Sequence, residues 1–69
     1  MSPDKLAYMA NQIGKFFVHQ PHDKAVAAIA DHIQKYWDPR MRGTIMAHLS
    51  AVQLDPLVRE AMESLRAPA

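Results

Sequence analysis

Apolar residues recur every three or four positions along most of the chain, which is the period of an amphipathic helix. Four segments show this pattern, and we predict helices over residues 3–18, 22–37, 39–52 and 56–66. No stretch alternates apolar and polar residues with a period of two, so the sequence predicts no strand. The expected fold is therefore all-α, a small bundle of about four short helices that forms a single domain over residues 1–69.

Each predicted helix has an apolar face that we expect to be buried. In the first two helices this face consists of Leu6, Met9, Ala10, Ile13, Phe16 and Phe17, and of Val26, Ile29, Ala30, Ile33 and Trp37. In the last two it consists of Met41, Ile45, Leu49 and Val52, and of Leu57, Val58, Ala61, Met62 and Leu65. Residues 25–30 are apolar on nearly every side, so we expect the second helix to lie at the centre of the bundle.

Three of the predicted helices begin with the same signal, a capping side chain followed by proline. The signal is Ser2-Pro3 in the first helix, Asp38-Pro39 in the third and Asp55-Pro56 in the fourth. The side-chain oxygen accepts a hydrogen bond from the first turn, and proline suits the first helical position. We therefore expect tight corners at the two Asp-Pro pairs. The residues around them differ, so they do not indicate an internal repeat.

Gly14 and Gly43 lie inside predicted helices, where glycine costs about 1 kcal/mol relative to alanine. Either the helices tolerate these glycines or a neighbouring helix approaches closely at each position. The sequence alone leaves both explanations open.

The short chain and its composition favour a binding partner. A chain of 69 residues forms a core that rarely supplies more than about 3–5 kcal/mol without an additional constraint. The chain has no cysteine, so disulfides and thiolate metal sites are excluded. Apolar residues nevertheless make up 49% of it, and a chain this short is not expected to bury them all.

The charge and hydropathy patterns argue against two other kinds of partner. The formal net charge of +1 gives no strong attraction to nucleic acid or to an anionic membrane. No run of roughly 18 apolar residues is present, and the N-terminus lacks the pattern of a signal peptide. We therefore expect a cytoplasmic protein that does not bind a membrane.

Candidate sites for chemistry are weak. No serine or threonine lies in a recognisable nucleophile motif, and two distant glycines cannot form a phosphate-binding loop. Glu60 and Glu63 lie near arginines on one predicted helix, which favours a solvated charged face over an acid–base pair. His19 and His22 have the spacing of a metal-binding pair, but further ligands are missing. We predict no catalytic, cofactor-binding or metal-binding residue, and no enzymatic activity.

The densest basic and aromatic segment runs from Lys35 to Arg42, at the corner between the second and third helices. In one interpretation, Trp37 only anchors this corner within its own fold. In the other, the segment is an interaction hot spot, because Trp, Tyr and Arg dominate the energetics of interfaces. The two interpretations are compatible. The predicted partner-binding residues are Tyr36, Trp37, Arg40, Met41 and Arg42.

A small helical DNA-binding regulator is the alternative function, since helix-turn-helix modules are also small and helical. However, the other basic residues are scattered along the chain and offset by acidic ones. So small an electrostatic footprint would bind DNA poorly. We therefore do not expect nucleic acid among the partners.

The same segment carries a resemblance to a known family. The matching parts are residues 5–13 (Lys-Leu-Ala-Tyr-Met-Ala-Asn-Gln-Ile), 25–27 with 30–33, 36–42 (Tyr-Trp-Asp-Pro-Arg-Met-Arg) and 54–61. In this order they resemble the delta subunit of soluble, NAD-dependent formate dehydrogenases that contain molybdenum or tungsten. The Trp-Asp-Pro-Arg-Met run is the most specific of these motifs.

The resemblance implies a cytoplasmic complex. Its large catalytic subunit would carry a bis-pterin molybdenum or tungsten centre and iron–sulfur clusters and oxidise formate, while other subunits carry FMN and further clusters and reduce NAD⁺. This chain would be a non-catalytic accessory subunit without a cofactor. It would dock on the large subunit and support assembly, cofactor insertion or stability.

Overall fold

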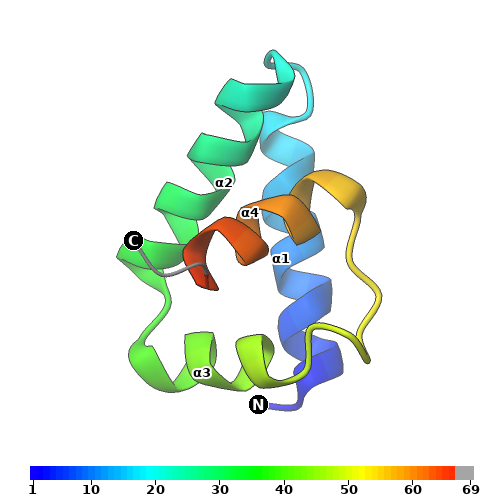
Figure 1. Cartoon of the computed structure of the whole chain (residues 1–69), viewed down its shortest axis with the longest axis vertical. Helices are drawn as coiled ribbons and strands as arrows, with labels where there is room; N and C mark the ends of the chain where they lie inside the picture. Colours follow the sequence, from blue (N-terminus) through cyan, green and yellow to red (C-terminus); the bar gives the residue numbers. More distant parts are fainter. Residues whose placement is uncertain (67–69) are drawn as a thin grey trace.

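The computed structural model describes residues 1–66 and contains four α-helices (Figure 1). They are α1 (Pro3–Phe17), α2 (His22–Tyr36), α3 (Pro39–Ala47) and α4 (Pro56–Arg66). The described residues contain no strand, which confirms the predicted all-α class. None of these helices is long and apolar enough to cross a membrane.

The helix with the most extensive packing against the others is α2. Figure 1 shows α1 and α2 meeting at one end, with α4 lying across them and α3 crossing near the other end of α1. The closest packing between two helices is that of α2 against α4, and α2 also packs against α1. This agrees with the prediction that the second helix lies at the centre of the bundle. The first helix, α1, packs against α2, α3 and α4.

The buried face of α1 differs from the predicted one mainly at Phe16. The buried residues of α1 are Leu6, Ala7, Ala10 and Gly14. Phe16, which was predicted to be buried, is 81% exposed. Met9, Ile13 and Phe17 pack against the core as predicted, whereas Phe16 projects on the opposite side of the helix from the buried Ala7.

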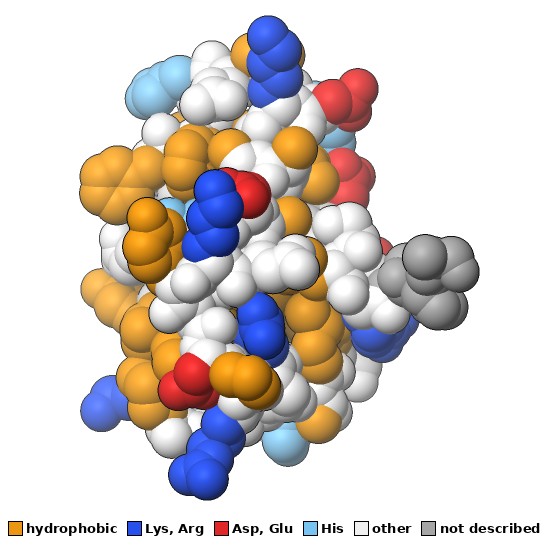
Figure 2. Space-filling view, turned by 90° about the vertical axis from the view of Figure 1, so that its left-hand side faces the viewer, with side chains coloured by type: hydrophobic (Ala, Val, Ile, Leu, Met, Phe, Trp, Pro, Cys, Tyr) orange, Lys and Arg blue, Asp and Glu red, His pale blue; other side chains and the backbone are white. Residues whose placement is uncertain are grey.

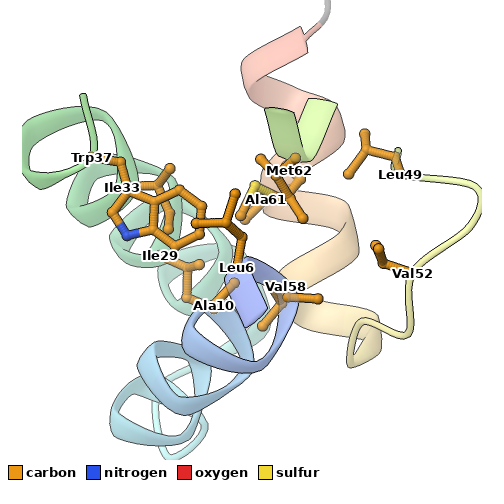
Figure 3. Close-up of a cluster of buried hydrophobic side chains, with 12 residues drawn as sticks. Leu6, Ala10, Ile29, Ile33, Trp37, Leu49, Val52, Val58, Ala61 and Met62 are labelled. Atoms are coloured by element: carbon orange, nitrogen blue, oxygen red, sulfur yellow. The ribbon is translucent and has the colours of Figure 1, made fainter. Parts of the chain in front are cut away.

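Apolar side chains from all four helices and from the turn after α3 form the core (Figure 3). Its buried members are Leu6, Ala7, Ala10, Ala25, Ile29, Ile33, Trp37, Ile45, Leu49, Val52, Val58, Ala61 and Met62. Among the described residues no polar or charged side chain is buried. The predicted faces of α2 and α4 thus supply much of the core.

Two of the three predicted helix caps are present. The Ser2 Oγ accepts a hydrogen bond from the Lys5 backbone N–H (3.2 Å), and the Asp38 Oδ1 accepts one from the Met41 N–H (2.8 Å). Asp55 differs, because the hydrogen bonds of residues 1–66 include none from the first turn of α4 to its carboxylate. Its backbone N–H instead donates to Asn11 Oδ1 on α1 (2.9 Å).

The third helix is shorter than predicted, ending at Ala47 and not at residue 52. Leu49 and Val52 are buried as expected, but they reach the core from turns that follow the helix. Arg59 on α4 donates to both of their carbonyl oxygens, from Nη1 to Leu49 (2.7 Å) and from Nη2 to Val52 (2.8 Å). These carbonyl groups therefore have partners without a continued helix. The other three helices end within one residue of their predicted bounds.

The two helical glycines have different surroundings. Gly14 is buried, and α4 lies against it. Gly43 is exposed, and a Cβ atom added there would meet no atom within 4 Å. Close approach thus explains Gly14, whereas simple tolerance explains Gly43.

Candidate interaction surface

The predicted partner-binding residues lie at the corner between α2 and α3, but they are not all on the surface. Trp37 is only 5% exposed and belongs to the core. In Figure 3 its indole ring lies near Leu6 and Ile33. Its backbone N–H also donates to the Ile33 carbonyl (2.9 Å), which closes the end of α2. Trp37 therefore anchors its own fold and offers little surface to a partner.

The two arginines of the corner have different roles. Arg42 is half-buried, and its Nη1 donates to the Gln34 carbonyl oxygen in the last turn of α2 (2.8 Å). Arg40 is exposed. Met41 is half-buried and packs against the core. Of the five predicted residues, only Tyr36 and Arg40 are thus fully on the surface.

Most of the aromatic side chains lie outside the core. The chain has two Phe, two Tyr and one Trp, and among these only Trp37 is buried. Phe16, Tyr36 and Tyr8 are 81%, 72% and 65% exposed, respectively. Aromatic rings bring a large apolar area, so leaving three of five in water is unfavourable for the isolated chain. Exposed apolar area of this kind is typical of interaction surfaces.

Two of these exposed rings belong to one patch, which we call the aromatic face: Ile13, Phe16 and Phe17 from α1, with His32 and Tyr36 from α2. The ring of His32 lies 6.5 Å from that of Phe17, edge to face, and 4.7 Å from that of Tyr36. The four residues other than Tyr36 line a shallow hollow of about 400 Å³. In Figure 2 hydrophobic side chains gather along the left-hand edge of the molecule.

The sequence predicted Tyr36 as a partner-binding residue but gave no role to His32. It placed Phe16 and Phe17 in the core, which is right for Phe17 and wrong for Phe16. One signal could have identified Phe16. Ala7, Ala10 and Gly14 follow the same helical spacing as the predicted stripe, and such a row of small residues is typical of a close helix contact. Phe16 projects on the opposite side of that contact from Ala7, because successive helical residues are separated by about 100°.

The charged residues form no candidate catalytic or metal centre in the described part of the chain. His22 Nε2 lies 2.7 Å from Glu60 Oε2, and Lys35 Nζ lies 3.1 Å from Asp31 Oδ2, both on the surface. Among residues 1–66 no three His, Asp or Glu side chains gather as metal ligands would. The suggested His19–His22 pair therefore finds no further ligand in this region, and the partner of His22 is a carboxylate.

The fold and this surface define a class: a small helical protein whose most distinctive exposed feature is an apolar, aromatic patch suited to contact with another protein. The comparison with protein families identifies the particular family. The model of the NADH-dependent formate dehydrogenase delta subunit, FdsD, matches residues 5–62 of the 69-residue chain. The chain belongs to this family, and the resemblance seen in the sequence is confirmed.

Neither the curated proteins nor the solved structures give a match to this chain. The family assignment favours the role of an accessory subunit over the alternative of a DNA-binding regulator.

Proposed function

We propose that this chain is a non-catalytic accessory subunit of a cytoplasmic, NAD-dependent formate dehydrogenase, and that it docks on the large catalytic subunit. The observation that carries the proposal is the family match over residues 5–62, because the family is that of a subunit of this enzyme. The exposed aromatic side chains support a role in binding.

The proposed contribution of this chain is to the assembly, cofactor insertion or stability of the complex. A protein that binds only the folded form of a partner stabilises that form by mass action. The gain is about 2.7 kcal/mol when the free binder is at one hundred times its Kd. An accessory subunit with no chemistry of its own can therefore hold a catalytic subunit in a cofactor-ready conformation.

We further propose that the cofactors of the complex lie in its other subunits. These are the bis-pterin molybdenum or tungsten centre, the iron–sulfur clusters, FMN and the NAD site. Iron–sulfur clusters are held mainly by cysteine thiolates, and this chain has no cysteine. Its two glycines both lie inside helices, α1 and α3, so the chain has no glycine-rich loop for a nucleotide phosphate.

The test is to produce the formate dehydrogenase complex with and without this chain in the same host. Four properties are compared: co-purification of the chain, formate-dependent NAD⁺ reduction, molybdenum or tungsten per large subunit, and half-life of activity on heating. We expect the chain to co-purify, and its omission to lower at least one of the other three. Failure to co-purify, with all three properties unchanged, would contradict the proposal.

A second measurement separates the two kinds of role. The purified chain is added to the complex that was made without it. Recovery of thermal stability without a change in metal content supports a structural role. A metal deficit that added chain does not repair supports a role during cofactor insertion. The chain alone is expected to show no formate oxidation.

A further inference from the structure

We infer that residues 39–54, which comprise α3 and the turns after it, form a strap that opens and closes as one unit over α1, α2 and α4. Opening uncovers the apolar surface beneath Ile45, Leu49 and Val52 while the other three helices stay packed. The strap follows an extended linker, Trp37 and Asp38, and ends just before α4. This device belongs to the chain itself and does not depend on the proposed function.

The strap supplies few of the buried core residues. Within α3 only Ile45 is buried, whereas α1 has four buried residues and α2 and α4 have three each. The turns add Leu49 and Val52. In Figure 3 these two side chains lie on the α4 side of the cluster, away from α2. The closest helix packing, that of α2 against α4, is therefore made without the strap and can persist when the strap opens.

Shallow hollows separate the strap from its neighbours in two places. One, of about 260 Å³, lies between α3, at Gly43 and Met46, and residues of α2 and α4. Another, of about 370 Å³, lies between α1 and the turns, at Ala51 and Gln53. Closely packed protein interiors leave few spaces of this size. The strap is thus packed less completely than the other helices are packed against one another.

Side-chain hydrogen bonds join the strap to each of the other three helices. Arg42 Nη1 donates to the Gln34 carbonyl oxygen of α2 (2.8 Å), and Asn11 Nδ2 of α1 donates to the Gln53 carbonyl oxygen (3.1 Å). Arg59 of α4 donates to two carbonyl oxygens of the turns. The first two bonds are exposed, so water can replace them when the strap opens. These hydrogen bonds fix the closed position and can break together.

The helix of the strap depends on its contacts for its own stability. It has nine residues, and isolated helices shorter than about 12–15 residues are marginal in water. Gly43 lowers its helix propensity further. When the contacts of α3 with α1 are lost, the helix also loses its support. Opening of the strap and unfolding of α3 are therefore coupled, which makes the strap one unit.

The first test is amide hydrogen exchange of the 69-residue chain, measured by NMR at several urea concentrations below the unfolding transition. We expect the hydrogen-bonded amides of the strap to exchange about tenfold faster, or more, than the slowest amides of α1, α2 and α4. They should share one urea dependence, weaker than that of global unfolding, because opening exposes less surface.

Two other results would overturn the strap. If its amides exchange with the same rate and urea dependence as the slowest amides, residues 39–54 open only when the whole protein unfolds. If their exchange does not depend on urea and differs from one amide to the next, these residues fluctuate locally and do not open as one unit.

The same substitution in the strap and outside it gives a matched pair. Ile45 on α3 and Ile29 on α2 are both fully buried. Ile29 lies near Gly14, towards the end of α1 that is away from α3 (Figure 1). Ile45→Val should accelerate exchange in the strap about fivefold. Ile29→Val weakens the part that stays folded, so it should accelerate the slowest amides about fivefold but the strap amides less than about twofold. Equal acceleration of the strap by both variants would overturn its separate opening.

Asn11→Ala tests one of the hydrogen bonds that hold the strap. The substitution removes the donor to the Gln53 carbonyl oxygen, so exchange in the strap should accelerate about fivefold. Lys35→Ala is the control, because the ion pair of Lys35 with Asp31 lies within α2. It should leave exchange in the strap within about twofold of the original rate. Unchanged exchange in Asn11→Ala would overturn the role of Asn11 in holding the strap closed.

Discussion

Gly14 on α1 lies so close to Val58 on α4 that no room remains for another carbon atom between them. A Cβ atom added to Gly14 would lie 2.5 Å from Val58 Cγ2. Val58 is fully buried, and its branched side chain has little rotamer freedom. The approach of α4 to α1 therefore depends on glycine at this position, despite its low helix propensity.

Gly14→Ala is expected to destabilise the protein. Overpacking a core costs about 1–3 kcal/mol, and the gain in helix propensity offsets up to about 1 kcal/mol of it. We expect a net loss of about 1–2 kcal/mol in the free energy of unfolding, measured by urea denaturation. Gly43→Ala is the control, since the added methyl group meets nothing. It should raise stability by about 0.5–1 kcal/mol.

A second-site change tests the cause. If the clash with Val58 is responsible, Gly14→Ala should lower the free energy of unfolding less in a Val58→Ala background than in the original protein. The cost of Val58→Ala alone is subtracted in this comparison. Additive effects of the two substitutions would contradict the contact as the cause.

The sequence predicted well what depends on neighbouring residues. Three of the four helices end where their periodicity and capping signals indicate, because those signals act within one or two turns. The end of α3 was missed for the opposite reason. Leu49 and Val52 continue the apolar spacing, but the arginine that bonds their carbonyl groups, Arg59, comes from another helix. No local pattern reports such a contact.

The candidate surface was only partly predictable for a related reason. The basic and aromatic segment at the end of the second helix predicted Tyr36 as a partner-binding residue, and Tyr36 is exposed in the structure. Whether Phe16 is buried depends on which side of α1 meets α4. That choice is made by the contact between Gly14 and Val58, which joins residues 44 positions apart. The sequence allowed Trp37 to be an anchor of its own fold, a contact to a partner, or both. Its burial favours the anchoring role.

Trp37→Ala tests that anchoring role. Replacing a buried tryptophan with alanine costs about 3–5 kcal/mol, which approaches the whole stability expected of a domain this small. We expect the variant to be largely unfolded by circular dichroism at 25 °C. Tyr36→Ala, one residue away but exposed, should change stability by less than about 0.5 kcal/mol. A folded Trp37→Ala variant that fails to bind the complex would restore Trp37 as a direct contact.

The two Asp-Pro corners should respond differently to the same substitution. Asp38 accepts a hydrogen bond from the first turn of α3, so Asp38→Ala should lower the free energy of unfolding by about 1 kcal/mol. The hydrogen bonds that involve Asp55 are made by its backbone N–H and carbonyl groups, which alanine retains. Asp55→Ala should therefore have an effect below about 0.5 kcal/mol. Thermal unfolding of both variants measures their losses of stability. Equal losses would show that the Asp55 side chain also caps its helix.

Arg59 is expected to hold the turns between α3 and α4. Its guanidinium group donates to the carbonyl oxygens of Leu49 and Val52 at once, a geometry that a lysine ammonium group cannot reproduce. Hydrogen bonds to a charged group contribute about 1.5–3 kcal/mol each, so Arg59→Lys should lose at least one such contribution.

Arg59→Lys should loosen the turns between α3 and α4 as well as lower the stability of the whole protein. Amide hydrogen exchange in residues 48–55 should accelerate in Arg59→Lys before exchange in α1 and α2 does, because the turns lose the side chain that joins them to α4. Arg40→Lys is the control, since Arg40 is exposed and the substitution keeps its charge. Uniform acceleration throughout the protein would indicate that Arg59 stabilises the whole fold and does not act mainly on these turns.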